Sequence, residues 1–294
     1  MVVLNYLLFN LPMNKILLQD DFFITFFCLI DDLCKAFLPK KISSNRIGRR
    51  PMLSLSELIT IGVYFTFNNS NTFKGFYRLF LCNKYFTYLP EYSRLLRNIK
   101  ESTYDVMFLI KIICAINCSL DKAGIKIIDS MPLPVCSNKR IFGYKVSELA
   151  GRGKSSIGWY YGFKLHLIID LEGKVLKFEI TPGNISDKDR QLMRYLCKGL
   201  KGILIGDKGY LSRELKEELS DMGIILQTGL KKGIKAIATF TYHSNLRLRQ
   251  FIETTFGRIK FRQGCATTLA RSADGYFFRY ILSLFTYILM VQFI

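Results

Sequence analysis

Three acidic residues have the type and surroundings of a divalent-metal site. Asp129 ends a short apolar run that predicts a strand, and Asp207 follows a second run, Ile203–Ile205. Glu253 lies in a helix predicted from about Asn245 to Lys260. Carboxylates suit Mg²⁺ or Mn²⁺, and two such ions can activate an attacking oxygen and stabilise a leaving one in phosphoryl transfer. We therefore predict that these three acids are catalytic and hold two Mg²⁺ or Mn²⁺ ions.

The elements predicted after about residue 120 would bring these acids together. Their order is three strands, then helix, strand, helix, strand and helix, at residues 126–129, 160–169, 175–180, 187–200, 203–205, 212–221, 224–226 and 245–260. Ser186 or Asp187 is expected to cap the first of these helices. This order predicts an α/β fold with a mixed sheet and helices on both faces, in which sites collect at strand ends. Asp129 and Asp207 should then lie at adjacent strand tips, with Glu253 closing the site.

Charge indicates the partner. The 294 residues include 42 Lys and Arg against 23 Asp and Glu, a net charge of +19, which is typical of proteins that bind nucleic acid. A membrane-surface protein would gather its charge on one amphipathic helix, whereas basic residues here run from Lys15 to Arg279. The apolar run Tyr280–Ile294 is too short to span a bilayer and predicts a buried helix. We expect a cytoplasmic protein with reduced cysteines, no signal peptide and no membrane partner.

The first part of the chain has a helical pattern. Apolar residues recur at helical spacing from Asp20 to about Ile99, and Ser54 with Glu57 predicts a capping box. Lys40–Pro51 reads as a basic connector between helices. We predict an all-helical N-terminal domain at 1–115, which binds DNA ends or only supports the other half. The catalytic domain is predicted at 120–294 and includes the C-terminal helix.

Basic residues surround the predicted acids. Five of them fall in a predicted loop between the first two strands, close to Trp159: Lys139, Arg140, Lys145, Arg152 and Lys154. Cations beside aromatic rings suit phosphate contact and base stacking, although a solvated basic loop would look the same. On the last helix, Arg249 precedes Glu253 by one turn and Lys260 follows it by two turns. Either could contact phosphate, or could be a solvated or ion-paired side chain.

Several motifs resemble those of DDE-class insertion-sequence transposases, most closely the bacterial insertion-sequence family numbered 982. The matching segments are Ile128–Ser130, Gly162–His166, Thr181–Ile185 and Asp207–Tyr210, with Arg249, Glu253 and Lys260 in the spacing of the third-acid motif. Broader relatives carry a Tyr where this chain has Leu246, so no role is assigned there. The resemblance covers nearly the whole chain, but its specific motifs lie in the catalytic half.

This resemblance implies a ribonuclease-H-like fold and metal-dependent hydrolysis at transposon ends, freeing 3′-hydroxyl groups that attack target DNA. It implies transposon-end DNA with terminal inverted repeats and target DNA as partners, and a homodimer in the DNA complex. It also places His166 near the site, and we predict DNA contacts for Lys164, His166 and Lys208.

Two other functions stay open from the sequence. The same acids could serve a nuclease that hydrolyses DNA or RNA without strand transfer, or the chain could be an inactive copy that still binds inverted repeats. Taken singly, Asp129 and Asp207 could be turn residues, and Glu253 could pair with Arg249 on a helix surface. Asp170, Asp187 and Asp189 are rival acids that we assign to a turn and to helix capping.

Overall fold

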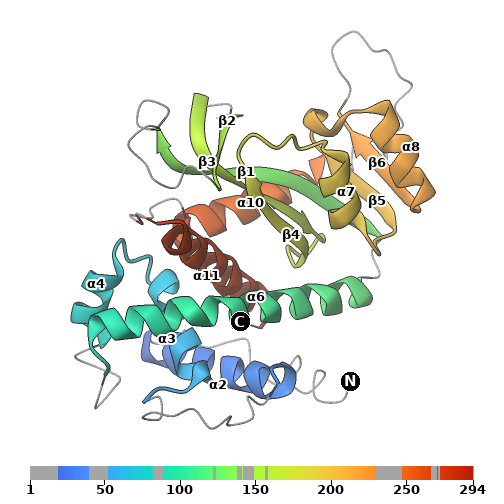
Figure 1. Ribbon diagram of the computed structural model, residues 1–294. Helices are drawn as coiled ribbons and strands as arrows, with labels where there is room; N and C mark the ends of the chain where they lie inside the picture. Colours follow the sequence, from blue (N-terminus) through green and yellow to red (C-terminus); the bar gives the residue numbers. More distant parts are fainter. Residues whose placement is uncertain are drawn as a thin grey trace. The chain divides into compact units, whose positions relative to one another are not determined.

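The computed structural model describes residues 19–39, 52–81, 89–121, 124–137, 141, 149–155, 158–229, 247–265, 270 and 272–293. The chain forms two compact units, one made of Met1–Ile112 with Ile259–Ile294 and the other of Ile113–Arg258 (Figure 1). The domain prediction assigned the C-terminal helix to the catalytic half. In the structure this helix belongs to the first unit.

The first unit is helical, as predicted. Its elements are α2 (Gln19–Phe37), α3 (Leu55–Phe67), α4 (Phe73–Phe76), the π-helical η1 (Tyr77–Leu81), the first part of α6 (Tyr92–Leu120), most of the π-helical η4 (Arg258–Arg262) and α11 (Ala273–Gln292). The predicted capping box is confirmed: Ser54 N–H donates to Glu57 Oε2 at 2.6 Å, and Glu57 N–H donates to Ser54 Oγ at 3.2 Å. The predicted basic connector lies outside the described residues.

Helix α11 forms part of the core of this unit, which confirms the predicted buried terminal helix. A Cβ at Gly62 of α3 would lie 2.9 Å from Leu282, so glycine allows the close approach of α3 and α11. Thr66 and Thr286 share a buried hydrogen bond of 2.6 Å between these helices. Among the described helices, α6 alone is long and apolar enough to cross a membrane, and 39% of its most apolar window is buried. Core helices of soluble proteins meet the same criterion, so this is weak evidence for a membrane span.

The second unit is built on a six-stranded mixed sheet. Its strands are β1 (Ile125–Ser137), β2 (Gly151–Ser155), β3 (Gly158–Ile169), β4 (Val175–Pro182), β5 (Gly202–Gly206) and β6 (Ile224–Thr228). The order is β2-β3-β1-β5-β6, and β4 also pairs with β3. Strands β1 to β4 pair antiparallel, whereas β1 pairs parallel with β5 and β5 with β6. The predicted mixed sheet is therefore confirmed.

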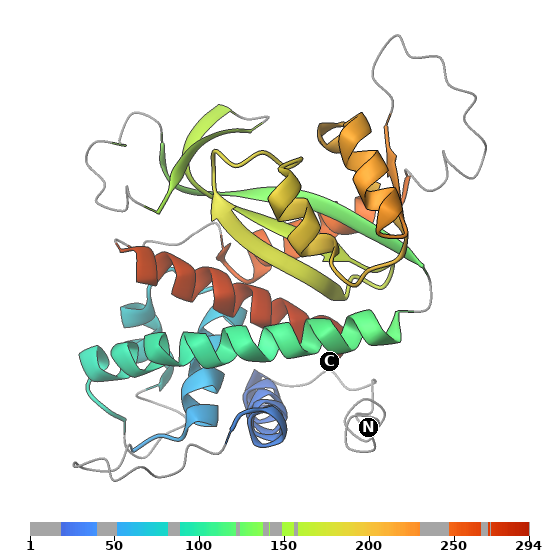
Figure 2. The same cartoon turned by 45° about the vertical axis from the view of Figure 1, so that its right-hand side comes forward.

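Helices cover both faces of this sheet. On one face, α7 (Arg190–Cys197) and α8 (Arg213–Asp221) share a buried core with sheet residues such as Ile128 and Leu204. Helix α10 (Gln250–Gly257) contacts β1. Both views place α7 and α10 on opposite sides of the sheet (Figures 1 and 2). Because α10 carries Glu253 and follows Arg249, this packing brings the third predicted acid to the β1 region of the sheet.

Three local predictions were wrong in detail. Strand β1 continues eight residues beyond Asp129, because it gains β3 as an antiparallel partner along that length. The predicted basic loop contains an edge strand, β2, whose alternation of Gly with charged residues hid it. Helix α7 begins at Arg190 and is capped by Asp189, whose side chain accepts from Leu192 N–H. The helix predicted at 245–260 corresponds to α10, which begins at Gln250, and to the start of η4; residues 245 and 246 lie outside the described part, so its predicted start is not tested.

Candidate active site

Strand register brings Asp129 and Asp207 together. The parallel pairing of β1 with β5 ends at Ile127 opposite Ile205. Asp129 lies two residues beyond Ile127, and Asp207 lies two residues beyond Ile205, directly after β5. Residues two apart in extended backbone point to the same face of the sheet. Asp207 continues in an extended conformation, with φ −73° and ψ 169°. The two carboxylates therefore meet where the parallel ladder ends, although Asp129 is not at the tip of its own strand.

A single guanidinium bridges the two acids. Arg249 Nη1 donates to Asp207 Oδ1 at 3.0 Å, and its Nη2 lies 3.6 Å from Asp129 Oδ2. Arg249 is the residue before α10, so the contact of this helix with β1 positions it. Its side chain is 25% exposed, and its buried Nε has no hydrogen-bond partner among the described residues. The cation offsets the repulsion between two adjacent negative charges.

Burial makes Asp129 an unusual carboxylate. It raises the pKa of Asp129 to about 6, while the Ser130 N–H bond and the Arg249 guanidinium lower it and Asp207 and Asp187 raise it. Burial makes the charged form of a carboxylate less stable, and a cation that binds the carboxylate stabilises that form. Asp129 is therefore a carboxylate that a bound divalent cation would stabilise.

The third predicted acid does not join the other two. Glu253 is exposed in the first turn of α10, one helical turn beyond Arg249. Among the described residues, no group of three or more Asp, Glu, His or Cys side chains is gathered closely enough to hold a metal ion. A divalent cation still fits the chemistry of Asp129 and Asp207, because both carboxylates already converge on one positive group. The ion therefore fits two acids, Asp129 and Asp207. Glu253 lies one helical turn beyond Arg249, the residue that bridges them.

The edge hairpin of β2 and β3 presents basic and aromatic side chains. Arg152 Cζ lies 4.9 Å from the ring centroid of Trp159, and Lys154 Nζ lies 5.8 Å from it. The indole is 53% exposed and both cations are exposed. Two of the five predicted loop residues are thus brought together on one strand. Lys139, Arg140 and Lys145 lie outside the described residues.

The other predicted DNA-contacting residues differ in how far their side chains are exposed. Lys208 is exposed, directly after Asp207. Lys260 lies in η4, within the first unit, with Nζ 5.3 Å from the ring centroid of Phe261. Lys164 and His166, by contrast, have side chains that are 14% and 0% exposed and make contacts inside the protein.

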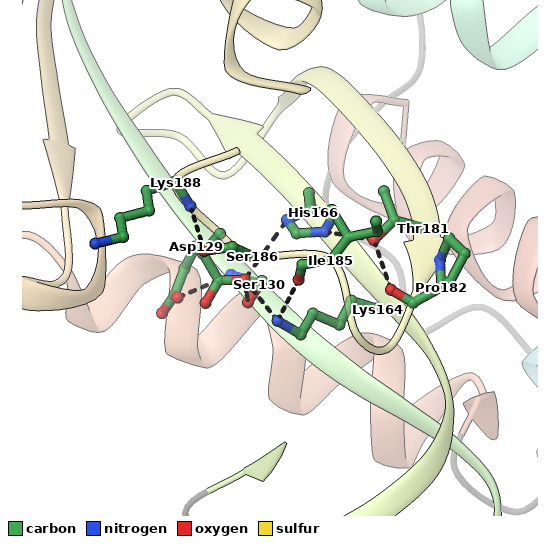
Figure 3. A network of polar contacts seen from close by, with 10 residues as sticks. Asp129, Ser130, Lys164, His166, Thr181, Pro182, Ile185, Ser186 and Lys188 are labelled. Carbon is green, nitrogen blue, oxygen red and sulfur yellow. Dashed lines mark hydrogen bonds and ion pairs between the residues drawn. The ribbon is translucent and has the colours of Figure 1, made fainter. Parts of the chain in front are cut away.

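Lys164 and His166 belong to a polar network around Asp187, a residue predicted to cap a helix (Figure 3). Asp187 Oδ1 accepts from Ser130 Oγ at 2.8 Å and from Lys164 Nζ at 3.1 Å, and Lys164 also donates to Ile185 O at 2.8 Å. His166 Nε2 shares a 2.9 Å hydrogen bond with Thr181 Oγ1. The network therefore links β1, beside Asp129, to β3 and to the segment before α7. Both Asp187 and Asp189 had the spacing of a cap, so no sequence signal separated their roles.

Residues 120–273, just over half of the chain, match the family described as "Transposase DDE domain". The chain belongs to this family. One similar solved structure is described as "Cryo-EM structure of piggyBac transposase synaptic complex with hairpin DNA (SNHP)", with 12% identity and a TM-score of 0.42 over 80% of this chain. The chain spans 51% of that structure's chain, and a likeness of this size carries no functional argument. Comparison with curated proteins gives no match.

Acidification should destabilise the chain through His166. Burial lowers the pKa of His166 from 6.5 to about 4, with Asp187 opposing the shift and Lys164 adding to it. The unfolded chain then binds more protons between pH 6.5 and 4, so this stabilisation is complete above pH 6.5 and is lost as the pH falls towards 4. Between pH 7 and 5 we expect the wild type to lose about 2 kcal/mol more unfolding free energy than His166→Gln, by urea denaturation.

The wild type is compared with His166→Gln because Asp129 changes the unfolding free energy with pH in the opposite direction to His166. Its pKa is raised on folding from 3.8 to about 6, so its contribution grows as the pH falls through the same window. Both proteins contain Asp129, and its effect cancels in the difference. Equal losses in the wild type and the variant would show that His166 takes up no fewer protons when folded.

Asp187 should matter more to stability than Asp189, two residues away. Asp187→Ala leaves the largely buried Lys164 ammonium without a carboxylate, which we expect to reduce the unfolding free energy by about 2 kcal/mol after allowing for the partial exposure of Asp187. Asp189→Ala removes only a helix cap, worth about 1 kcal/mol. Urea denaturation of these two variants tests this. A double-variant cycle with Lys164→Met, Asp187→Leu and both changes together tests the ion pair, and the pair assignment fails if the double variant loses as much unfolding free energy as Lys164→Met and Asp187→Leu do in sum.

Proposed function

We propose that this protein is a metal-dependent transposase that hydrolyses insertion-sequence ends and joins the freed 3′-hydroxyl groups to target DNA. The observation that carries the proposal is the convergence of Asp129 and Asp207 on Arg249, in a chain whose residues 120–273 match a transposase domain. The strand order β4-β3-β1-β5-β6, antiparallel and then parallel, supports a ribonuclease-H-like assignment. Membership of the bacterial family numbered 982 and a cytoplasmic location remain predictions.

In this proposal Asp129, Asp207 and Glu253 are the acids that hold Mg²⁺ or Mn²⁺. The two ions, when bound, would supply Lewis-acid stabilisation of charge on the attacking and leaving oxygens. Arg249 contacts both acids, and its guanidinium would suit a phosphate of the DNA if the carboxylates held metal. Glu253 would join the site by a change of side-chain rotamer, since it is exposed beside Arg249.

The protein must also hold the DNA strand against these acids. Arg152, Lys154 and Lys208 are exposed cations that suit phosphate oxygens, and Trp159 offers a ring face. Lys164 and His166 act indirectly, since their network fixes Ser130 and hence the backbone next to Asp129. Terminal inverted repeats in the flanking DNA and a homodimer that holds two ends are further expectations of the proposal.

Cleavage of labelled DNA ends with Mg²⁺ tests the acids. Asp129→Asn and Asp207→Asn should each reduce the cleavage rate at least about a hundredfold, because each removes a metal ligand worth several kcal/mol in the transition state. Asp170→Asn is the matched control, since Asp170 accepts from Glu172 and Lys174 N–H in the β3–β4 turn and an amide oxygen can do the same. Full activity in Asp207→Asn would contradict the mechanism.

The same reaction separates transposition from plain hydrolysis. With target DNA present, the proposal expects products in which the 3′ end is joined to the target. Cleavage without joined products would support the nuclease alternative. Binding of inverted repeats without cleaved or joined products would support an inactive copy. The same reaction with Glu253→Gln tests whether the third acid has a catalytic role.

A further inference from the structure

The helical unit contains a cavity of about 640 Å³ that the proposed chemistry does not use. Its lining comes from α3, α4 and the segment before it, the N-terminal part of α6, and the start of α11 with Ala270, all within the first unit. A cavity of this size suits a small-molecule-sized group and is too small for a DNA duplex.

One side of the cavity is aromatic. Phe73 lies 6.1 Å from Tyr92, 5.2 Å from Phe65 and 6.4 Å from Phe278, measured between ring centroids. All four rings line the cavity. In this aromatic wall Phe65, Phe73 and Phe278 are buried and Tyr92 is partly exposed, so the ring of Tyr92 is the one that a flat, partly apolar ligand such as a nucleic-acid base can stack on.

The polar lining residues are cationic or neutral. Lys74, Lys100 and Arg279 line the cavity, and no Asp or Glu appears among its described lining residues. The cavity also touches Ser272 and Gly275 at the start of the 20-residue helix α11, where the helix dipole favours an anion, although Ser272 Oγ already accepts from Gly275 N–H at 3.3 Å and Asp274 stands in the same turn. These groups together suit a phosphate.

Arg279 is the most unusual of the three cations. It is 2% exposed, its Nε donates to Gly264 O at 3.0 Å and its Nη1 to Ser70 O at 3.1 Å. Its Cζ lies 4.3 Å from the ring centroid of Phe65, and no described carboxylate pairs with it. Burial lowers the pKa of Arg279 to about 10, so its charge is poorly compensated and a nearby anion would stabilise it.

We propose that this cavity binds one unpaired nucleotide of a DNA strand, with the base on the aromatic wall and the phosphate towards Lys74, Lys100 and the start of α11. The choice of DNA as the source of the nucleotide rests on the proposed function. The site would give the helical unit a specific part in holding DNA, separate from the acids of the other unit.

The test measures binding of labelled duplexes to the full chain without metal, by fluorescence anisotropy. One duplex carries a single unpaired thymidine, one an unpaired abasic site, and one is fully paired. We expect the unpaired thymidine to bind about tenfold more tightly than either other duplex. Lys100→Ala should remove most of this preference and flatten the dependence of log affinity on log salt by about 0.7, the value for one phosphate contact.

Lys111→Ala is the control, because Lys111 is an exposed lysine on the same helix, outside the cavity lining. It should retain the preference. The proposal is overturned if the three duplexes bind equally, if the two variants behave alike, or if free thymidine monophosphate competes as well as the DNA does. The binding assay contains no metal and measures no cleavage, so failed catalysis and a failed nucleotide site remain distinguishable.

Discussion

The structure of the site depends on one constraint, the point at which the parallel pairing of β1 and β5 stops. Because the ladder ends at Ile127 and Ile205, the next side chains on the same face of each strand are both aspartates. Two carboxylates this close repel each other, and the fold meets that repulsion with Arg249. The arrangement that Arg249 stabilises is also the one that we propose holds a metal ion.

A second polar system supports the first from the neighbouring position of β1. Successive side chains of a strand point to opposite faces, so Ser130 points away from Asp129 towards Asp187 and Lys164. On β3, Lys164 lies opposite Pro132 of β1 and His166 lies opposite Ser130 of β1. Lys164 and His166 therefore lie on the same face of the sheet as Ser130. Asp129 is thus held from both sides of the sheet, by α10 through Arg249 on one and by the Asp187 network on the other.

Much of this could be predicted from the sequence. Apolar periodicity, which depends only on neighbouring residues, located the helices and most strands, and the order of these elements along the chain predicted a mixed sheet. The closeness of Asp129 and Asp207 could be predicted because it requires only that their two strands be neighbours in the sheet. The edge strand β2 was missed because its alternate residues are glycine, which carries no apolar signal.

What could not be predicted depends on contacts between distant residues. Asp187 and Asp189 have equal claims to a cap, and only the position of Lys164 and Ser130 decides that Asp187 turns inward. Likewise, the sequence gives no means of knowing that Arg249 reaches both acids while Glu253 remains exposed. The cavity of the helical unit joins residues about 200 positions apart in the chain, so no local pattern indicates it.

The most direct test of the site is a Mn²⁺ titration of the DNA-free protein at pH 7.5, followed by electron paramagnetic resonance. If Asp129 and Asp207 form a cation site that Arg249 fills, Arg249→Gln should bind Mn²⁺ about tenfold more tightly than the wild type, because a competing charge within about 4 Å is gone. Asp207→Asn should lose this binding. Unchanged Mn²⁺ affinity in both variants would contradict the account.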